Sequence, residues 1–406
     1  MDSKNPKTVN NRLHCLAIHQ LLWLCCNFLG IPVYAQVFPD TTTNLPIDVD
    51  FLFHYYDQDG NHSAVTGGQG TEKLEDISNN LIVNIPLDST QTLDIGVSLN
   101  VYSSASTDRI DRRMSSASLT DVRGAFQVGW GQENPRQSTN WHWQAGASIE
   151  SDYISTHLGG SFYKSFKDDH TSLWVEGKAY FDKWVLYFPE ELRTTVQPTI
   201  TTDKRNSYHL DIQLQQVINR RLNMALSTGL EYQSGLLSTP FHRVYFPEEG
   251  FPRIEYFPAQ RWKWPLGIRV NYFLGGRTVL RFFYRYYWDD FGIHSHTISL
   301  ESPIKLNYKW AVTPVYRYYQ QSASDYFAPF DSHSPDAPFY TSDYDLSAFR
   351  SHKWGLGIRY APYSRFTLLR QKWKAELKLV SLRWVSYTRS DGLRAWSLGG
   401  HLGWRF

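Results

Sequence analysis

The chain has 406 residues with 41 Lys and Arg, 39 Asp and Glu, and a formal net charge of +2. This balance gives no support for nucleic-acid binding, which draws on an excess of basic residues. Aromatic residues make up 16% of the chain, which is high for a soluble domain, and the length allows two or three soluble domains or one large all-β unit.

The start of the chain has the pattern of a secretory signal. Basic residues precede the apolar run "LLWLCCNFLGIPVYA", and Val33 and Ala35 are the small residues that a signal peptidase requires. We predict a cleaved signal over 1–35 and a single domain over 36–406, with an uncleaved anchor helix as the alternative. All three cysteines lie in the signal, so the mature chain is predicted to have no disulfide, thiol nucleophile or cysteine metal ligand.

Beyond the signal, apolar and polar residues alternate along nearly the whole chain. The alternating segments begin near Leu81, Leu93, Val122, Leu173, Tyr208, Met224, Trp262, Thr278, Trp310, Lys353, Trp373 and Trp396. Because strand side chains point alternately to two faces, each segment has one apolar and one polar face. Each is about ten residues long, the length with which a tilted strand crosses a bilayer, and no later stretch has the apolar length of a membrane helix. An integral membrane protein with this pattern must be a closed barrel.

The connections distinguish a barrel from a soluble β-sandwich, whose strands also alternate. Short turns such as "KDDH" and "LGGRT" are interspersed with long links such as 233–261 and 321–351. We therefore predict an all-β fold, a transmembrane antiparallel up-and-down β-barrel of about sixteen strands (14 to 18), with short periplasmic turns and long extracellular loops, in the cell outer membrane. Tryptophans near the segment ends suit the membrane interfaces.

Three residues carry further structural predictions. Pro303 and Pro314 fall within predicted strands, where their missing N–H groups indicate bulges or misplaced boundaries. Phe406 ends the last alternating segment, and a final aromatic resembles the C-terminal signal that the barrel-assembly machinery recognises. We therefore expect that machinery, together with the lipid bilayer, among the partners.

Two motifs in the first half of the chain carry a family resemblance. They are "HSAVTGGQGTEKLEDISNNLIVNIPLD" and "YSSASTDRIDRRMSSASLTDVR", and they resemble the signature of an uncharacterised outer-membrane barrel family known only as a domain of unknown function. The resemblance spans nearly the whole mature chain. It implies an outer-membrane barrel of a Gram-negative bacterium and a periplasmic lipoprotein as a candidate partner, but no established activity.

The second motif supplies a candidate constriction. Charged residues lie between two copies of "SSAS", namely Asp108, Arg109, Asp111, Arg112 and Arg113. One interpretation is a loop folded into the lumen, which the family resemblance favours, and the other is a solvated external loop with internal salt bridges.

A candidate calcium site lies in "DQDGNHS". Asp57, Asp59 and Asn61 occupy alternate positions and offer the oxygen ligands that calcium prefers. His62 replaces the glycine of an EF-hand loop, however, and an Asp/Gly turn explains the segment without a metal.

A candidate basic stripe lies in the second half of the chain. Five arginines predicted to face inward form it, namely Arg269, Arg281, Arg285, Arg359 and Arg394. Such a stripe would favour anionic solutes. The alternative is internal pairing with Glu231, Asp211 and Asp289.

The functional hypotheses follow from the barrel. The first is a passive pore for small polar solutes, because about sixteen strands enclose a water-filled lumen unless loops fill it. The second is a non-conducting scaffold whose loops bind a periplasmic lipoprotein or a surface ligand. An outer-membrane hydrolase would need a catalytic constellation, and only His62 with Ser63 and the "HSH" at 294–296 suggest one. We predict no enzyme activity, no cofactor and no nucleic-acid partner.

Overall fold

The computed structural model describes residues 45–103, 120–166, 169–187, 200–362 and 375–406. The predicted signal, 1–35, and the charged residues 108–113 of the candidate constriction lie outside the described residues. In the part of the chain that is described, no helix is long and apolar enough to cross a membrane.

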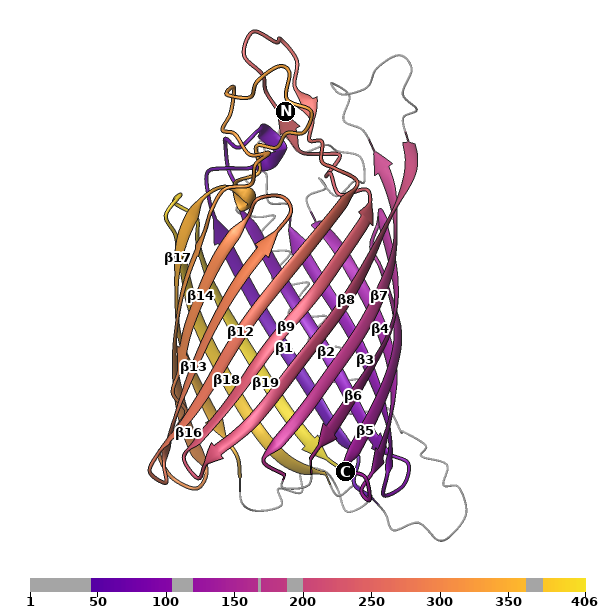
Figure 1. The fold of residues 1–406 in the computed structure, drawn as a ribbon, viewed down its shortest axis with the longest axis vertical. Helices are drawn as coiled ribbons and strands as arrows, with labels where there is room; N and C mark the ends of the chain where they lie inside the picture. Colours follow the sequence, from indigo (N-terminus) through magenta and orange to yellow (C-terminus); the bar gives the residue numbers. More distant parts are fainter. Residues whose placement is uncertain (1–44, 104–119, 167–168, 188–199, 363–374) are drawn as a thin grey trace, which may run out of the picture. The chain divides into compact units, whose positions relative to one another are not determined.

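Antiparallel strands pair in chain order and close into a barrel (Figure 1). Closure is direct, because β1 pairs with β2 on one side and with β19 on the other. The strands of the wall are β1 Asp48–Asp59, β2 Leu74–Pro86, β3 Gln91–Ser103, β4 Thr120–Asn134, β5 Thr139–Ile149, β6 Tyr153–Ser165, β7 Thr171–Tyr187, β8 Ile200–Asn219, β9 Leu222–Gly235, β12 Gln260–Leu274, β13 Thr278–Asp289, β14 His294–Glu301, β15 Ile304–Lys305, β16 Trp310–Gln321, β17 Phe349–Tyr360, β18 Glu376–Arg389 and β19 Arg394–Arg405.

The wall contains 16 strands, because β14 and β15 are two parts of one strand. Both pair with β13 and β16, and the interruption between them contains Pro303. Pro314 of β16 lies beside this interruption, where its carbonyl accepts from the Ser302 N–H at 3.1 Å. The N–H and C=O of one strand residue point to the same neighbour, so the missing N–H of Pro314 faces the interruption and the ladder with β17 continues. The predicted strand number is confirmed, and one of the two prolines breaks its strand.

The two faces of the wall differ as the alternation predicts. Large apolar side chains are exposed on the outward face, for example Leu158 at 60% and Trp354 at 58%. The inward face carries polar and small residues, such as the hydrogen-bonded pair Gln127 and Gln144. Only a solvent that is itself apolar makes such an outward belt favourable, so the protein is an integral barrel of the outer membrane.

The two ends of the barrel differ in their connections. At the lower end in Figure 1, where β1 begins and β19 ends, most strands are joined by tight turns, as at 220–221 and 275–277, and the exception is the longer link 361–375 between β17 and β18. At the upper end, the long loops 60–73, 236–259 and 322–348 occur beside short turns such as 290–293. The predicted links 233–261 and 321–351 are slightly longer than these loops, because the flanking strands extend into both ends of each link.

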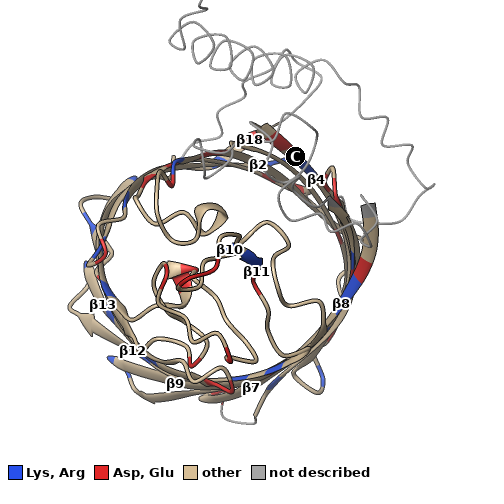
Figure 2. Cartoon of the chain, turned by 90° about the horizontal axis from the view of Figure 1, so that it is seen from above, with Lys and Arg blue, Asp and Glu red and all other residues tan. Residues whose placement is uncertain are grey.

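Among the described residues, the three loops 60–73, 236–259 and 322–348 form a cap with its own apolar core. Seen from above, they lie within the circumference of the barrel (Figure 2). Loop 60–73 contains the 3-10 turn η1 Ala64–Thr66, loop 236–259 contains the small sheet of β10 Arg243–Val244 and β11 Arg253–Ile254, and loop 322–348 contains η3 Tyr344–Leu346. In the core of this cap, Val244 and Phe246 are 0% and 1% exposed. The three loops are far apart in the sequence, and packing around these buried side chains gives the cap a defined structure.

Candidate functional site

The inward face of the barrel is divided into an acidic wall and a basic wall. Carboxylates dominate β1 to β8, where the inward acids include Asp50, Asp76, Asp94, Asp121, Glu176, Asp182 and Asp211. Cations dominate β12 to β18, where the inward bases include Arg261, Lys263, Arg269, Arg281, Arg285, Arg317, Lys353, Arg359, Arg383 and Arg389. Fixed charges of opposite sign on facing walls create a field across the lumen.

Most charges of the acidic wall have local partners. Arg205 forms an ion pair with the buried Asp182 at 3.0 Å, and Lys178 pairs with Glu176 at 3.0 Å. Two histidines contact carboxylates of other strands. His401 of β19 contacts Asp50 of the neighbouring β1 at 2.8 Å, and His142 of β5 reaches across β4 to Asp94 of β3 at 2.7 Å. We infer that these contacts fix the rotamers of the wall.

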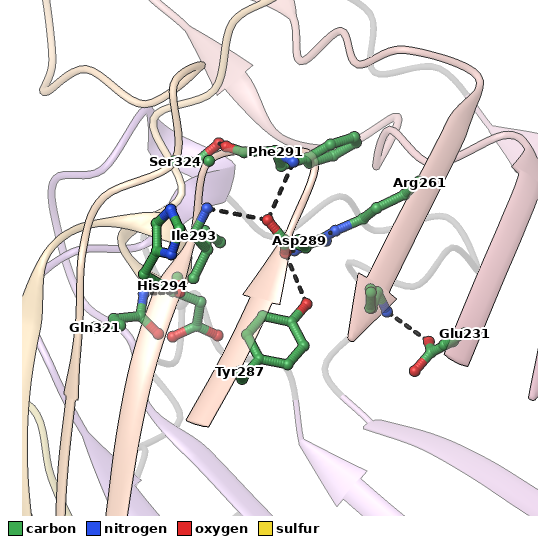
Figure 3. A network of polar contacts seen from close by, with 12 residues as sticks. Glu231, Arg261, Tyr287, Asp289, Phe291, Ile293, His294, Gln321 and Ser324 are labelled. Atoms are coloured by element: carbon green, nitrogen blue, oxygen red, sulfur yellow. Dashed lines mark hydrogen bonds and ion pairs between the residues drawn. The ribbon is translucent and has the colours of Figure 1, made fainter. Parts of the chain in front are cut away.

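At the upper end of the basic wall, Asp289 is the centre of a polar network (Figure 3). Its side chain is 0% exposed. Arg261 donates to it at 2.5 Å and 3.2 Å, the Tyr287 hydroxyl donates at 2.7 Å, and the N–H groups of Phe291 and Ile293 donate at 3.1 Å and 3.0 Å. The network therefore fixes the turn between β13 and β14, against which the cap packs through Ser324 and the Phe291 carbonyl.

Two of the three predicted partners of the basic stripe form ion pairs with other cations. Arg261 forms an ion pair with Asp289, and Lys263 forms an ion pair with Glu231 at 2.6 Å. Among the described residues, Asp211 forms no ion pair. Internal ion pairs therefore do form on this wall. Their cations are Arg261 and Lys263, which are not among the five arginines of the predicted stripe.

The structure places four of the five stripe residues on the inward face. Arg281 pairs with Glu301 at 2.9 Å, Arg269 lies 5.6 Å from the centre of the Phe283 ring, and Arg285 lines a cavity. Arg359 lies lower on the inward face of β17, opposite Ala311. Each of these four arginines has a different environment, so they do not form one uniform stripe.

Arg394 was predicted to face inward, and the structure corrects this. It lies on β19 at an even position, with Trp396 and Leu398, which are 41% and 37% exposed on the outward face. Ala395, on the opposite face, is buried. Successive residues of a strand point to opposite faces, so an assignment that is wrong by one residue exchanges the two faces. Arg394 therefore points outward.

The candidate calcium segment is also corrected. Asp57 and Asp59 belong to β1, so the turn expected around them does not form. They point outward with Phe51 and Phe53, and an extended backbone separates alternate residues by about 7 Å. Asn61 follows the end of the strand. The structure therefore does not bring the three oxygen ligands together in a loop around one ion.

Two other groups of side chains have metal-ligand chemistry. In each, the ligand atoms lie within 4.8 Å of one another, and the groups are His242, Glu255 and Asp343 in the cap, and Asp121, Glu150 and Asp152 at the upper rim. In the cap group, burial alone would lower the pKa of His242, but the carboxylates of Glu255 and Asp343 outweigh it and raise that pKa to about 9. The protonated imidazole of His242 thus supplies, from within this group, the positive charge that balances the carboxylates.

The cap contains a further titratable residue, Glu72, which is half-buried. Glu72 accepts a hydrogen bond from the Gln58 side chain at 3.3 Å. Burial and the nearby carboxylate of Asp345 raise the pKa of Glu72 to about 7. The charge state of the cap therefore changes near neutral pH.

The pairs that suggested an enzyme are not assembled into a catalytic arrangement. The His62 ring stacks on Tyr344 at 3.8 Å and contacts the Gly68 carbonyl at 2.9 Å, while Ser63 is buried at 2% exposure. His294 and His296 lie on the outward face and contact Tyr286 and Tyr284. Each histidine has a structural partner.

A cavity of about 610 Å³ lies where the basic wall meets the underside of the cap. Its charged lining comprises Arg285, Arg317, Lys353, Arg389 and Asp345. Of these residues, only Arg285 belongs to the predicted basic stripe. The inward positions of Arg317 and Lys353 follow from the same alternation that predicted the strands, and that signal was present in the sequence.

Together these features define a class of protein, a 16-stranded outer-membrane barrel with a charged lumen and a structured cap. The chain belongs to the family described as protein of unknown function (DUF3570), whose model matches residues 106–379. This confirms the resemblance to a barrel family of unknown function. None of the curated proteins compared matches the chain.

Solved outer-membrane structures are similar to the chain at low sequence identity. A ferric enterobactin receptor from Pseudomonas aeruginosa is 10% identical with a TM-score of 0.45, over 86% of this chain and 54% of the receptor. OccK1 of the same organism is 8% identical with a TM-score of 0.40, over 90% and 100%. A bacterial polysaccharide outer membrane secretin is 9% identical with a TM-score of 0.49, over 89% and 98%. The chain thus spans just over half of the receptor, and the barrel assignment rests on its own strand pairing.

Proposed function

We propose that the protein is a passive pore for small polar solutes, with its upper mouth narrowed by the cap. The observation that carries the proposal is the polar, charged inward face of a closed 16-stranded wall, because barrels of this size enclose more space than wall side chains fill. The candidate constriction of Asp108, Arg109, Asp111, Arg112 and Arg113 belongs to the same proposal as a second narrowing. A calcium-dependent step and an enzymatic step are not part of it.

The cap supports a second candidate function, a non-conducting scaffold. Its core is as buried as that of a folded domain, with Val244 at 0% and Phe246 at 1% exposure. Beneath loop 236–259 lies a second cavity of about 1380 Å³, whose lining includes the exposed aromatic residues Phe251 and Tyr256. Such a surface suits a bound surface ligand, and the barrel would then anchor the cap that binds it.

Conductance of the folded protein in planar bilayers distinguishes the two functions. Val244 is 0% exposed in the cap core, so Val244→Asp buries an unpaired charge and opens the cap. A pore predicts measurable conductance in the wild type and a larger conductance in V244D. Phe251→Ser is the matched control, because Phe251 is 76% exposed on the same loop. A wild type and V244D that both remain closed would support the scaffold.

A further inference from the structure

A row of inward side chains crosses five neighbouring strands of the basic wall. Arg285 of β13 lies opposite Thr297 of β14, Arg317 of β16 lies directly opposite Lys353 of β17, and Lys353 lies opposite Tyr387 of β18. Residues opposite one another in an antiparallel pair have Cβ atoms about 5 Å apart. All five side chains line the 610 Å³ cavity.

The cations of this row have no acidic partner among the described residues. In contrast, Arg261, Lys263 and Arg281 on the same wall each form an ion pair with a carboxylate. The one acid in the cavity lining, Asp345, is bound by Arg389. Like charges directly opposite in a sheet destabilise it, so Arg317 and Lys353 create a local excess of positive charge that an anion would neutralise.

A buried hydroxyl points to the same conclusion. Thr297 is 4% exposed, and its Oγ1 has no hydrogen-bond partner among the described residues. Buried hydroxyls in proteins are normally hydrogen-bonded. Thr297 lies between the strands of Arg285 and Arg317, where its hydroxyl is available to donate to a bound oxyanion.

We propose that this cavity binds a small oxyanion with more than one negative charge, carrying carboxylate or phosphate groups, between Arg285, Arg317 and Lys353. The volume of about 610 Å³ is in the range of small-molecule sites. The role of the site as a selective step in transport rests on the proposed pore function, whereas binding itself does not.

The test measures binding of citrate and of inorganic phosphate to the full-length folded protein in detergent by isothermal titration calorimetry. The variant R317Q/K353Q removes the two opposed charges, and it is expected to weaken binding at least tenfold. Arg350→Gln is the matched control, because Arg350 is a cation on the outward face of the same strand as Lys353. Binding to R350Q is expected to stay within twofold of the wild type. The two probes separate a carboxylate site from a phosphate site.

Two results would overturn the site: neither anion binds at millimolar concentration, or R317Q/K353Q binds as tightly as R350Q. Retained heat-modifiable migration in gels shows that each variant is folded. If the double variant does not fold, Thr297→Val takes its place, with an expected loss of about three- to tenfold for one hydrogen bond, and unchanged binding then refutes the site. A protein that binds citrate but never conducts refutes the pore and keeps the site, and one that conducts without binding refutes the site alone.

Discussion

Replacing Asp289 with Ala removes the acceptor at the centre of the upper polar network. The carboxylate is 0% exposed and receives hydrogen bonds from Arg261, Tyr287 and the N–H groups of Phe291 and Ile293. Removing one partner of a buried ion pair leaves an uncompensated charge, which costs about 3–5 kcal/mol. The lost backbone hydrogen bonds act on the same network and do not add in full, so we expect D289A to lower the free energy of unfolding by about 3–5 kcal/mol.

Urea unfolding of the protein in lipid vesicles, followed by tryptophan fluorescence, measures this loss. Asp290→Ala is the control, because Asp290 is exposed and its replacement is expected to change the free energy by about 0.5 kcal/mol or less. In a double-mutant cycle with Arg261→Ala, the double variant should be less destabilised than the sum of the single variants by about 1.5 kcal/mol or more. A loss below about 1 kcal/mol in D289A, or a coupling energy near zero, would refute the argument.

Three further predictions concern the cap, the outward face and the end of β19. The pKa of Glu72 is raised from 4.5 to about 7, so its favourable protonated state contributes fully below pH 4.5 and is lost as the pH rises to about 7. Proteolysis of the cap should therefore be faster at pH 8 than at pH 5. Glu72→Gln should reduce this difference, and an unchanged difference would exclude Glu72 as its source, because burial also raises the pKa of Asp343 in the cap. Because Arg394 faces outward, Arg394→Gln should leave the reversal potential under a salt gradient unchanged, and a shift toward cations would contradict its placement. Phe406→Ala should reduce the heat-modifiable fraction in membranes if the final aromatic is the assembly signal, while an unchanged fraction would remove that role.

The strand pattern was predictable because the bilayer imposes a simple rule on each strand. Every second residue must be apolar over the width of the membrane, and this rule places Leu158 and Trp354 outward from sequence alone. The same rule gives the inward position of Arg317 and Lys353. Arg394 shares the even register of Trp396 and Leu398, so the same rule places it outward, contrary to its predicted inward position.

The cap and the polar network were not predictable in the same way. Asp289 receives its partners from β12 and from the turn that follows β13, and no local pattern indicates this. The cap core joins Phe246 to His333 and Tyr340 of another loop, contacts that depend on how the barrel spaces the loop ends. The Asp57 segment shows that local composition can also mislead. Its residues favour a turn, but pairing of β1 with both neighbouring strands keeps Asp57 and Asp59 in an extended strand.

Pairing between β1 and β19 has a kinetic consequence. It joins Asp48 to Arg405, which are 357 positions apart, and contacts so distant in sequence form slowly because the chain between them must first lose its freedom. Until this last contact forms, two strand edges carry unpaired amides that hydrocarbon cannot satisfy. The rate of closure, more than the stability of the finished wall, is therefore expected to determine how much of the newly made chain escapes aggregation and degradation.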